Sequence, residues 1–118
     1  MGSRILGVGT DIEEVSRFRR LGEQFFERNF TRKEIDYCRS RADPYRHFAG
    51  RFACKEAITK ALSPSGFRAS FPEIEIVNNR HGAPMASISS MQGNSLMISI
   101  SHTREIATAT AILTDANR

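Results

Sequence analysis

Alanine recurs at every fourth position in the middle of the chain, at Ala49, Ala53, Ala57 and Ala61. Residues four apart lie on one face of an α-helix, so this spacing predicts a helix over residues 45–62 with a stripe of small side chains. Such a stripe allows close packing against a sheet or another helix. We therefore expect a second element to pack closely against this helix.

Capping boxes predict two shorter helices, because a threonine followed three residues later by a glutamate satisfies free backbone amides at a helix start. One box is Thr10 with Glu13, after a short apolar strand, and the other is Thr31 with Glu34. Beyond residue 72, apolar and polar residues alternate, which is typical of strands. Helices followed by antiparallel strands indicate an α+β fold in a single domain, residues 1–118. The predicted elements are, in residue numbers, a strand at 5–8, helices at about 11–19, 31–41 and 45–62, and strands at 74–77, 85–89, 96–101 and 106–113.

The charge balance narrows the choice of partners. The chain has 17 Lys+Arg against 13 Asp+Glu, a net charge of +4, which favours nucleic acid, a phosphate-rich small molecule or an acidic protein. Cys38 and Cys54 have no neighbouring Cys or His cluster, so we expect reduced thiols rather than a disulfide framework or a zinc site. No segment has the apolar length of a membrane span or of a signal-peptide core, and a cytoplasmic protein is expected.

Three sets of polar residues are candidates for chemistry, and each also has a structural explanation. Asp11 follows a glycine-flanked strand, where a carboxylate could hold a metal ion near phosphate or could complement a helix dipole. Glu56 and Lys60 share a helix face, either as a metal ligand beside a phosphate-binding amine or as an ordinary surface pair. His102 stands at a strand-to-turn junction, where it could neutralise a phosphate, shuttle a proton or cap the strand end.

In their order and spacing these sets resemble the small bacterial holo-acyl-carrier-protein synthases, a family of 4′-phosphopantetheinyl transferases. The resemblance covers residue 5 to about residue 113. The fold that it implies is α+β, with N-terminal helices packed on an antiparallel sheet. The motifs that carry it are Gly-Val-Gly-Thr-Asp-Ile at 7–12, Arg-Phe-Ala-Cys-Lys-Glu-Ala-Ile-Thr-Lys-Ala at 51–61 and Ile-Ser-His-Thr-Arg at 100–104, with secondary matches at 30–34, 74–78 and 82–84.

The resemblance implies transfer of 4′-phosphopantetheine from coenzyme A to a serine of an apo carrier protein, with Mg²⁺ as cofactor and adenosine 3′,5′-bisphosphate as the second product. Asp11 and Glu56 would hold Mg²⁺, and Glu56 or a water on the metal would accept the serine proton. The implied catalytic residues are Glu56, Lys60 and His102. The implied coenzyme A-binding residues are Arg51, Lys60, Gly82, Pro84, Ser101, His102 and Thr103.

The resemblance also implies partners. Arg17 and Arg20 would dock an acidic carrier protein, although each could also be part of a solvated helix face. A chain of this length holds one half of the two-half site of larger relatives, which implies a homotrimer with sites between subunits.

The chain departs from the family pattern at two places, and these departures bear on carrier specificity. Ser63-Pro64-Ser65-Gly66 replaces a glycine-rich loop near the diphosphate, and residues 42–44 replace basic residues before the long helix. Two other functions stay open: a non-catalytic scaffold that binds coenzyme A or a carrier, and a basic nucleic-acid-binding domain. No nucleic-acid-binding motif or basic–aromatic strand pattern supports the second, so we expect no nucleic-acid partner.

Overall fold

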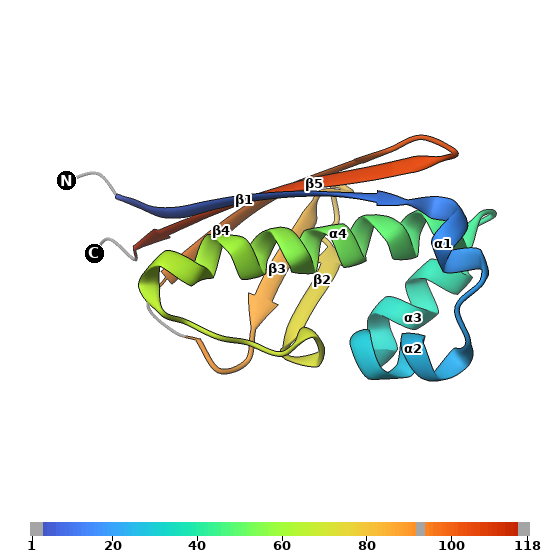
Figure 1. Cartoon of the computed structure of the whole chain (residues 1–118), viewed down its shortest axis with the longest axis horizontal. Helices are drawn as coiled ribbons and strands as arrows, with labels where there is room; N and C mark the ends of the chain where they lie inside the picture. The colour runs from blue at the N-terminus through green and yellow to red at the C-terminus, as the bar shows by residue number, and fades with distance from the viewer. Residues whose placement is uncertain (1–3, 92–93, 116–118) are drawn as a thin grey trace.

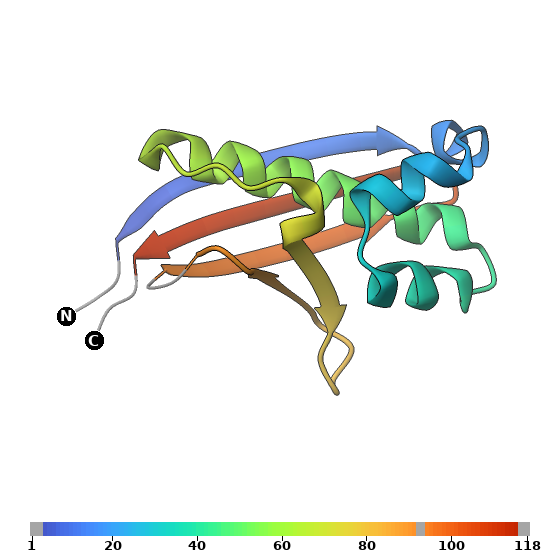
Figure 2. The same ribbon diagram turned by 90° about the horizontal axis from the view of Figure 1, so that it is seen from below.

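A long helix lies across one face of a three-stranded antiparallel sheet in the computed structural model, which describes residues 4–91 and 94–115 (Figure 1). The sheet has the order β1-β5-β4, and a separate two-stranded hairpin, β2-β3, projects beside it (Figure 2). This arrangement confirms the α+β class. The bounds are helix α4 Pro44–Leu62 and strands β1 Ile5–Glu14, β2 Ile74–Asn78, β3 Pro84–Ile88, β4 Asn94–His102 and β5 Ile106–Asp115.

Three short helices gather around the N-terminal half of α4 (Figure 1). They pack on α4 through a cluster of phenylalanines, and α4, the last of the helices that precede the strands of the hairpin, is the one that covers the sheet. The cluster contains Phe18, Phe26, Phe30, Phe48 and Phe52. The short helices are α1 Val15–Arg19, α2 Glu23–Asn29 and α3 Arg32–Arg39, and two 3₁₀ turns follow α4, η1 Ser63–Ser65 and η2 Phe71–Glu73.

The first predicted helix is wrong in its opening residues, because β1 continues through Glu14. Asp11 pairs with Ala109 of β5, and the N-cap of α1 is Glu14 rather than Thr10. Pairing with β5 satisfies the backbone amides that a capping box would otherwise have to satisfy. Asp11 therefore lies in a strand, and the helix-dipole explanation for it is excluded.

The other predicted elements are confirmed with small shifts at their ends. The Thr31 side chain accepts a hydrogen bond from the Glu34 amide, and Glu34 bonds back to the Thr31 amide, which is the expected capping box of α3. Asp43 caps α4 by accepting a hydrogen bond from the Tyr45 amide. Helix α2 was not predicted. Within the described residues, no helix combines the length and the apolarity that a membrane crossing requires.

The alanine stripe packs against β1, which is the close neighbour that its spacing predicted. All four alanines are fully buried. A Cβ atom added to Gly7 would lie 1.9 Å from the Ala61 carbonyl oxygen, and one added to Gly9 would lie 1.9 Å from the Ala57 carbonyl oxygen. Only glycine permits so close an approach of strand and helix. The strand that carries Asp11 is thereby held directly against the helix that carries Glu56 and Lys60.

A buried ion pair attaches the β2-β3 hairpin and helix α3 to α4. The side chains of Lys55 and Glu34 are fully buried, and Lys55 Nζ lies 2.7 Å from Glu34 Oε1. Glu34 Oε2 accepts a hydrogen bond of 2.7 Å from the Ile76 amide in β2. Lys55 Nζ also donates, at 2.8 Å each, to the carbonyl oxygens of Asn29, Phe71 and Ile74.

Candidate functional site

The carboxylate of Asp11 points from β1 toward α4 and is only partly satisfied. Its Oδ1 atom lies 3.6 Å from Lys60 Nζ, which also donates to the Thr10 carbonyl at 2.9 Å. Its Oδ2 atom is buried and has no hydrogen-bond partner among the described residues. A buried carboxylate oxygen without a partner is costly. This oxygen therefore fits a site for a cation.

Glu56 lies one turn before Lys60 on α4 and is half-buried. Among residues 4–91 and 94–115, no group of three or more His, Cys, Asp or Glu side chains could by itself hold a metal ion. A pair of carboxylates is nevertheless a common protein contribution to a Mg²⁺ site, with phosphate oxygens and water completing the shell. Asp11 and Glu56 are the side chains that could supply such a pair.

Glu13 is a second carboxylate on the same face of β1 as Asp11, and the sequence did not single it out. Burial, and after it a hydrogen bond with Asp11 and the charge of Asp11, raise its pKa from 4.5 to about 7 against the opposing effect of Arg17. Arg17 Nη1 donates to Glu13 Oε1 at 2.9 Å. The alternation of a strand, which places residues 11 and 13 on one face, is the signal that could have found it.

We expect Glu13 to make the metal-free protein less stable as the pH rises. Because folding raises the pKa of Glu13 from 4.5 to about 7, its stabilising contribution is complete below 4.5 and is lost as the pH rises through 7. The free energy of unfolding of wild type, relative to Glu13→Gln, should therefore fall between pH 4.5 and about 7. Urea denaturation in the presence of a chelator measures this free energy at each pH. Glu27→Gln on α2 is the control for removing an exposed carboxylate. A difference that stays constant or increases with pH would contradict the assignment.

A basic hollow of about 150 Å³ lies where α3, α4, the β2-β3 hairpin and β4 meet. Four of the residues expected from the sequence, Arg51, Gly82, Pro84 and His102, line it together, although they come from three separate segments. The remaining lining residues, which the sequence had not assigned to a site, are Tyr37, His47, Asn78 and Ile100.

Two arginines near this hollow each have a buried Nε atom that lacks an acceptor among the described residues. Arg51 is 5% exposed, donates to Asn78 Oδ1 at 3.3 Å, and stacks with its guanidinium carbon 4.4 Å from the centre of the Tyr37 ring. The Nε atoms of Arg51 and Arg46 are both buried without a hydrogen-bond partner among the described residues. Unpaired buried donors on cations are costly, and an anion in the hollow would supply acceptors for them.

The three polar residues at the end of β4 and in the turn after it, Ser101, His102 and Thr103, have different surroundings. Partial burial and the charges of Arg46 and Arg51 lower the pKa of the His102 imidazole. Ser101 is exposed on β4. The Thr103 hydroxyl accepts hydrogen bonds from the amides of Glu105 and Ile106, at 3.2 and 3.1 Å, and so holds the β4–β5 turn. Neither Ser101 nor Thr103 is among the described residues that line the hollow.

The two arginines expected to dock a partner lie at α1. Arg17 is bonded to Glu13, and its guanidinium carbon lies 5.2 Å from the centre of the Phe52 ring. Arg20 is the exposed C-cap residue of the helix. Arg17 is therefore connected to the carboxylates of β1, whereas Arg20 faces solvent.

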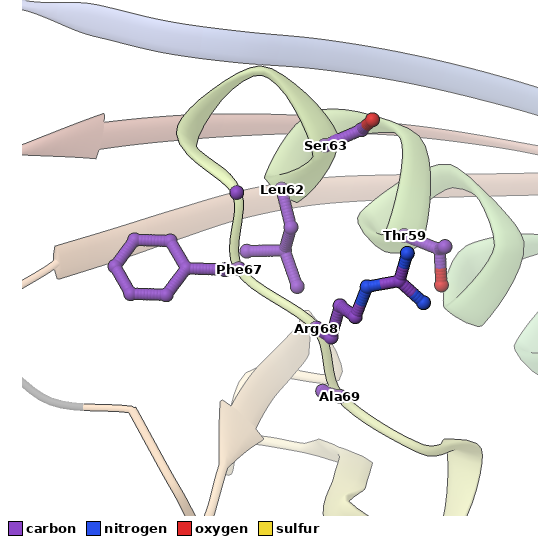
Figure 3. A pocket seen from close by; sticks show the side chains of 7 residues that line it. Thr59, Leu62, Ser63, Phe67, Arg68 and Ala69 are labelled. Carbon is purple, nitrogen blue, oxygen red and sulfur yellow. The ribbon is translucent and has the colours of Figure 1, made fainter.

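A larger hollow of about 380 Å³ lies at the C-terminal end of α4 (Figure 3). It contains none of the residues expected to do chemistry. Ser63–Ser65 forms a 3₁₀ turn here, and Gly66 ends the turn with a φ of 76°. The loop that departs from the family pattern thus keeps a glycine where the backbone is left-handed. The lining residues are Thr59, Leu62, Ser63, Gly66, Phe67, Arg68 and Ala69.

Both thiols are buried inside the helices and are free, as expected. Burial raises the pKa of Cys38 and of Cys54 to about 12. A thiol with so high a pKa holds little of the nucleophilic thiolate at neutral pH. The cysteines therefore take no part in the candidate site.

Comparison with known proteins first defines the class. Residues 7–111 match the family model described as the 4′-phosphopantetheinyl transferase superfamily. The holo-[acyl-carrier-protein] synthase of Protochlamydia amoebophila is 42% identical, over 91% of this chain and 96% of that protein, and the one of Chlamydia muridarum is 39% identical, over 92% and 94%.

A solved structure agrees with these relatives. The holo-(acyl-carrier-protein) synthase of Bacillus anthracis, in complex with CoA (3′,5′-ADP), superimposes with a TM-score of 0.83 at 32% identity, over 97% of this chain and 99% of that one. The chain belongs to the holo-[acyl-carrier-protein] synthase family of 4′-phosphopantetheinyl transferases.

Proposed function

We propose that the chain transfers the 4′-phosphopantetheine group of coenzyme A to a serine of an apo carrier protein, with Mg²⁺, and releases adenosine 3′,5′-bisphosphate. The observation that carries the proposal is the buried, unpartnered Oδ2 of Asp11 on a strand packed against α4. The basic hollow lies along the same helix, at Arg51. A cation site and an anion site therefore lie beside the same helix. They suit a substrate whose diphosphate binds at the cation and whose phosphate monoester binds in the basic hollow.

Asp11 and Glu56 would hold Mg²⁺, which when bound neutralises the negative charge of the diphosphate. Lys60 Nζ is half-exposed beside Asp11 and can donate to a diphosphate oxygen. In the transfer, the serine oxygen forms a bond to the β-phosphorus while the bond from that phosphorus to the leaving adenosine phosphate breaks. Glu56 is the candidate acceptor for the serine proton.

The hollow would hold the adenosine end of coenzyme A. Arg51 and His102 supply cationic or hydrogen-bonding groups for the 3′-phosphate, and Gly82 with Pro84 lies at the side where the base would rest. Ser101 and Thr103 flank His102, and we assign them to the margin of this site rather than to its floor. His102 would then act by holding the phosphate.

Docking of the carrier and assembly of the subunits complete the proposal. An acidic carrier protein would contact Arg17 and Arg20 through opposite charge. Because Arg17 is bonded to Glu13, a carrier bound there would lie next to the carboxylates of β1.

The outer face of the sheet supports assembly with further copies of the chain, as a homotrimer. Three cross-strand rows on this face carry no charge, and Val8, Ile12 and Met97 are 55%, 63% and 56% exposed. An uncharged sheet face with exposed large apolar side chains of this kind suits an interface. Sedimentation should give a trimer that Ile12→Glu dissociates, and a monomeric wild type would contradict it. The rows are Val8–Ile112–Met97, Thr10–Thr110–Ser99 and Ile12–Thr108–Ser101.

The decisive experiment mixes the protein with coenzyme A, Mg²⁺ and several apo carrier proteins. We expect the mass of a carrier to rise by one phosphopantetheine group, adenosine 3′,5′-bisphosphate to appear in equal amount, and a chelator to prevent both. Binding of coenzyme A without any mass shift would favour a non-catalytic scaffold. Binding of nucleic acid with a steep salt dependence would favour the nucleic-acid alternative.

A further inference from the structure

His47 faces His102 across the basic hollow, and nothing in the proposed reaction uses it. The two rings lie 4.9 Å apart between centres and are nearly perpendicular, at 72°. Tyr37 packs on the other side of His47, with ring centres 5.8 Å apart. Gly50 allows β4 to lie this close to α4, because a Cβ atom there would come within 2.9 Å of the Ile100 side chain.

The groups that face this histidine pair are mostly cationic. Arg46 and Arg51 come from α4, Arg41 precedes it, and Asp43, the N-cap of α4, is the carboxylate that opposes them at His102. Tyr37 of α3 is the remaining titratable neighbour. Burial first, and then the charges of His102 and the arginines, lower the pKa of His47 to about 4. At neutral pH both imidazoles are therefore uncharged in the free protein.

We propose that His47 is a second anion-binding imidazole of the hollow, and that His47 and His102 together take up one proton when a phosphate monoester binds. The proposal rests on the proposed function, which places the 3′-phosphate of coenzyme A in this hollow. The phosphate would accept hydrogen bonds from the unpartnered Nε atoms of Arg46 and Arg51. By neutralising those guanidinium groups, the phosphate removes the part of the effect that is due to the arginine charges, and its own negative charge favours the protonated imidazole. Two imidazolium groups so close together would repel, so the pair shares a single proton.

Proton uptake makes the affinity depend on pH in a defined direction. At a pH below the pKa of the free pair, the pair already holds its proton before the ligand binds. At a pH above the pKa of the bound pair, the pair stays neutral even with the ligand bound. Between these limits a proton enters with the ligand, so the dissociation constant rises by up to about tenfold per pH unit. Relative to His47→Phe/His102→Phe, in which the phosphate ionises in the same way, wild type should therefore bind a phosphate monoester progressively more weakly as the pH rises from about 6 to about 8.

The direct test is an NMR titration of histidine side chains with adenosine 3′,5′-bisphosphate as the probe. The chain has three histidines, and His81 on the hairpin turn, which does not line the hollow, is the internal reference. We expect saturating ligand to raise the pKa values of His47 and His102 and to leave His81 unchanged. A His47 pKa that stays at its free value in the bound protein would overturn the proposal.

Calorimetry in buffers of different ionisation enthalpy counts the protons independently. Wild type should take up about one proton more per ligand than the double variant His47→Phe/His102→Phe near pH 7, because the comparison cancels protonation of the phosphate itself. His81→Gln is the matched control and should behave as wild type. Equal uptake by wild type and the double variant, with the bisphosphate bound to both, overturns this proposal alone. Failure of wild type to bind the bisphosphate overturns it together with the proposed function.

Discussion

Asp11→Asn is expected to lower kcat/KM for carrier modification by at least about 100-fold, because the variant loses a charged ligand of the proposed Mg²⁺ site. It should not lose stability. The Asp11 carboxylate has a buried oxygen without a partner and raises the pKa of Glu13, whereas an amide can donate a hydrogen bond to that neighbour. Activity at several Mg²⁺ concentrations and urea denaturation, measured on the same preparation, separate the two effects.

The matched control for this substitution is Asp36→Asn. Asp36 lies on α3 in an exposed pair with Arg32, and both side chains are 68% exposed. It should leave activity and stability close to wild type. Wild-type activity of Asp11→Asn at limiting Mg²⁺ would show that Asp11 does not hold the metal.

Lys55→Met is expected to lower the free energy of unfolding by about 3–5 kcal/mol, because it leaves the buried charge of Glu34 without its partner. The same change removes the donor that the carbonyl oxygens of three segments share. The double variant Lys55→Met/Glu34→Gln should regain part of the loss, since neither charge is then buried alone. Urea denaturation followed by circular dichroism measures all three proteins.

Arg32→Met is the control for Lys55→Met, since it removes a cation from the exposed pair with Asp36. It should change stability little. A Lys55→Met protein as stable as Arg32→Met would mean that the ion pair does not hold the hairpin and α3 to α4.

The parts of the fold that the sequence predicted are those with a strong local signal. The capping box of Thr31 with Glu34 marked α3, and the alanine stripe marked α4 and its close packing. The box of Thr10 with Glu13 failed because pairing with β5, which is remote in sequence, supplied the hydrogen bonds. Helix α2 has seven residues and depends on the phenylalanine cluster rather than on its own propensity.

Site residues that belong to a family motif were predicted from the sequence. Residues whose properties depend on burial were missed. Arg51 and His102 were identified by resemblance, and they do line one hollow. Lys55 is the neighbour of Glu56 in the same predicted helix, and nothing in the sequence distinguishes it from an exposed lysine. Its burial follows from the structure, where the carbonyl oxygens of three other segments meet at its amine. Glu13 and His47 owe their shifted pKa values first to burial, and burial depends on elements that are remote in sequence.

The pairing of β1 with β5 has a consequence for the order of folding. The strand that carries Asp11 lies near one end of the described chain, and its only sheet partner, β5, lies near the other. Closing so long a loop is slow, and proteins dominated by such contacts fold more slowly than those with local ones. On the ribosome, α4 and its neighbouring helices can form while β1 still lacks a partner. The side of the site proposed to bind the metal would thus be the last part to assemble, after residues 106–115 have left the ribosome.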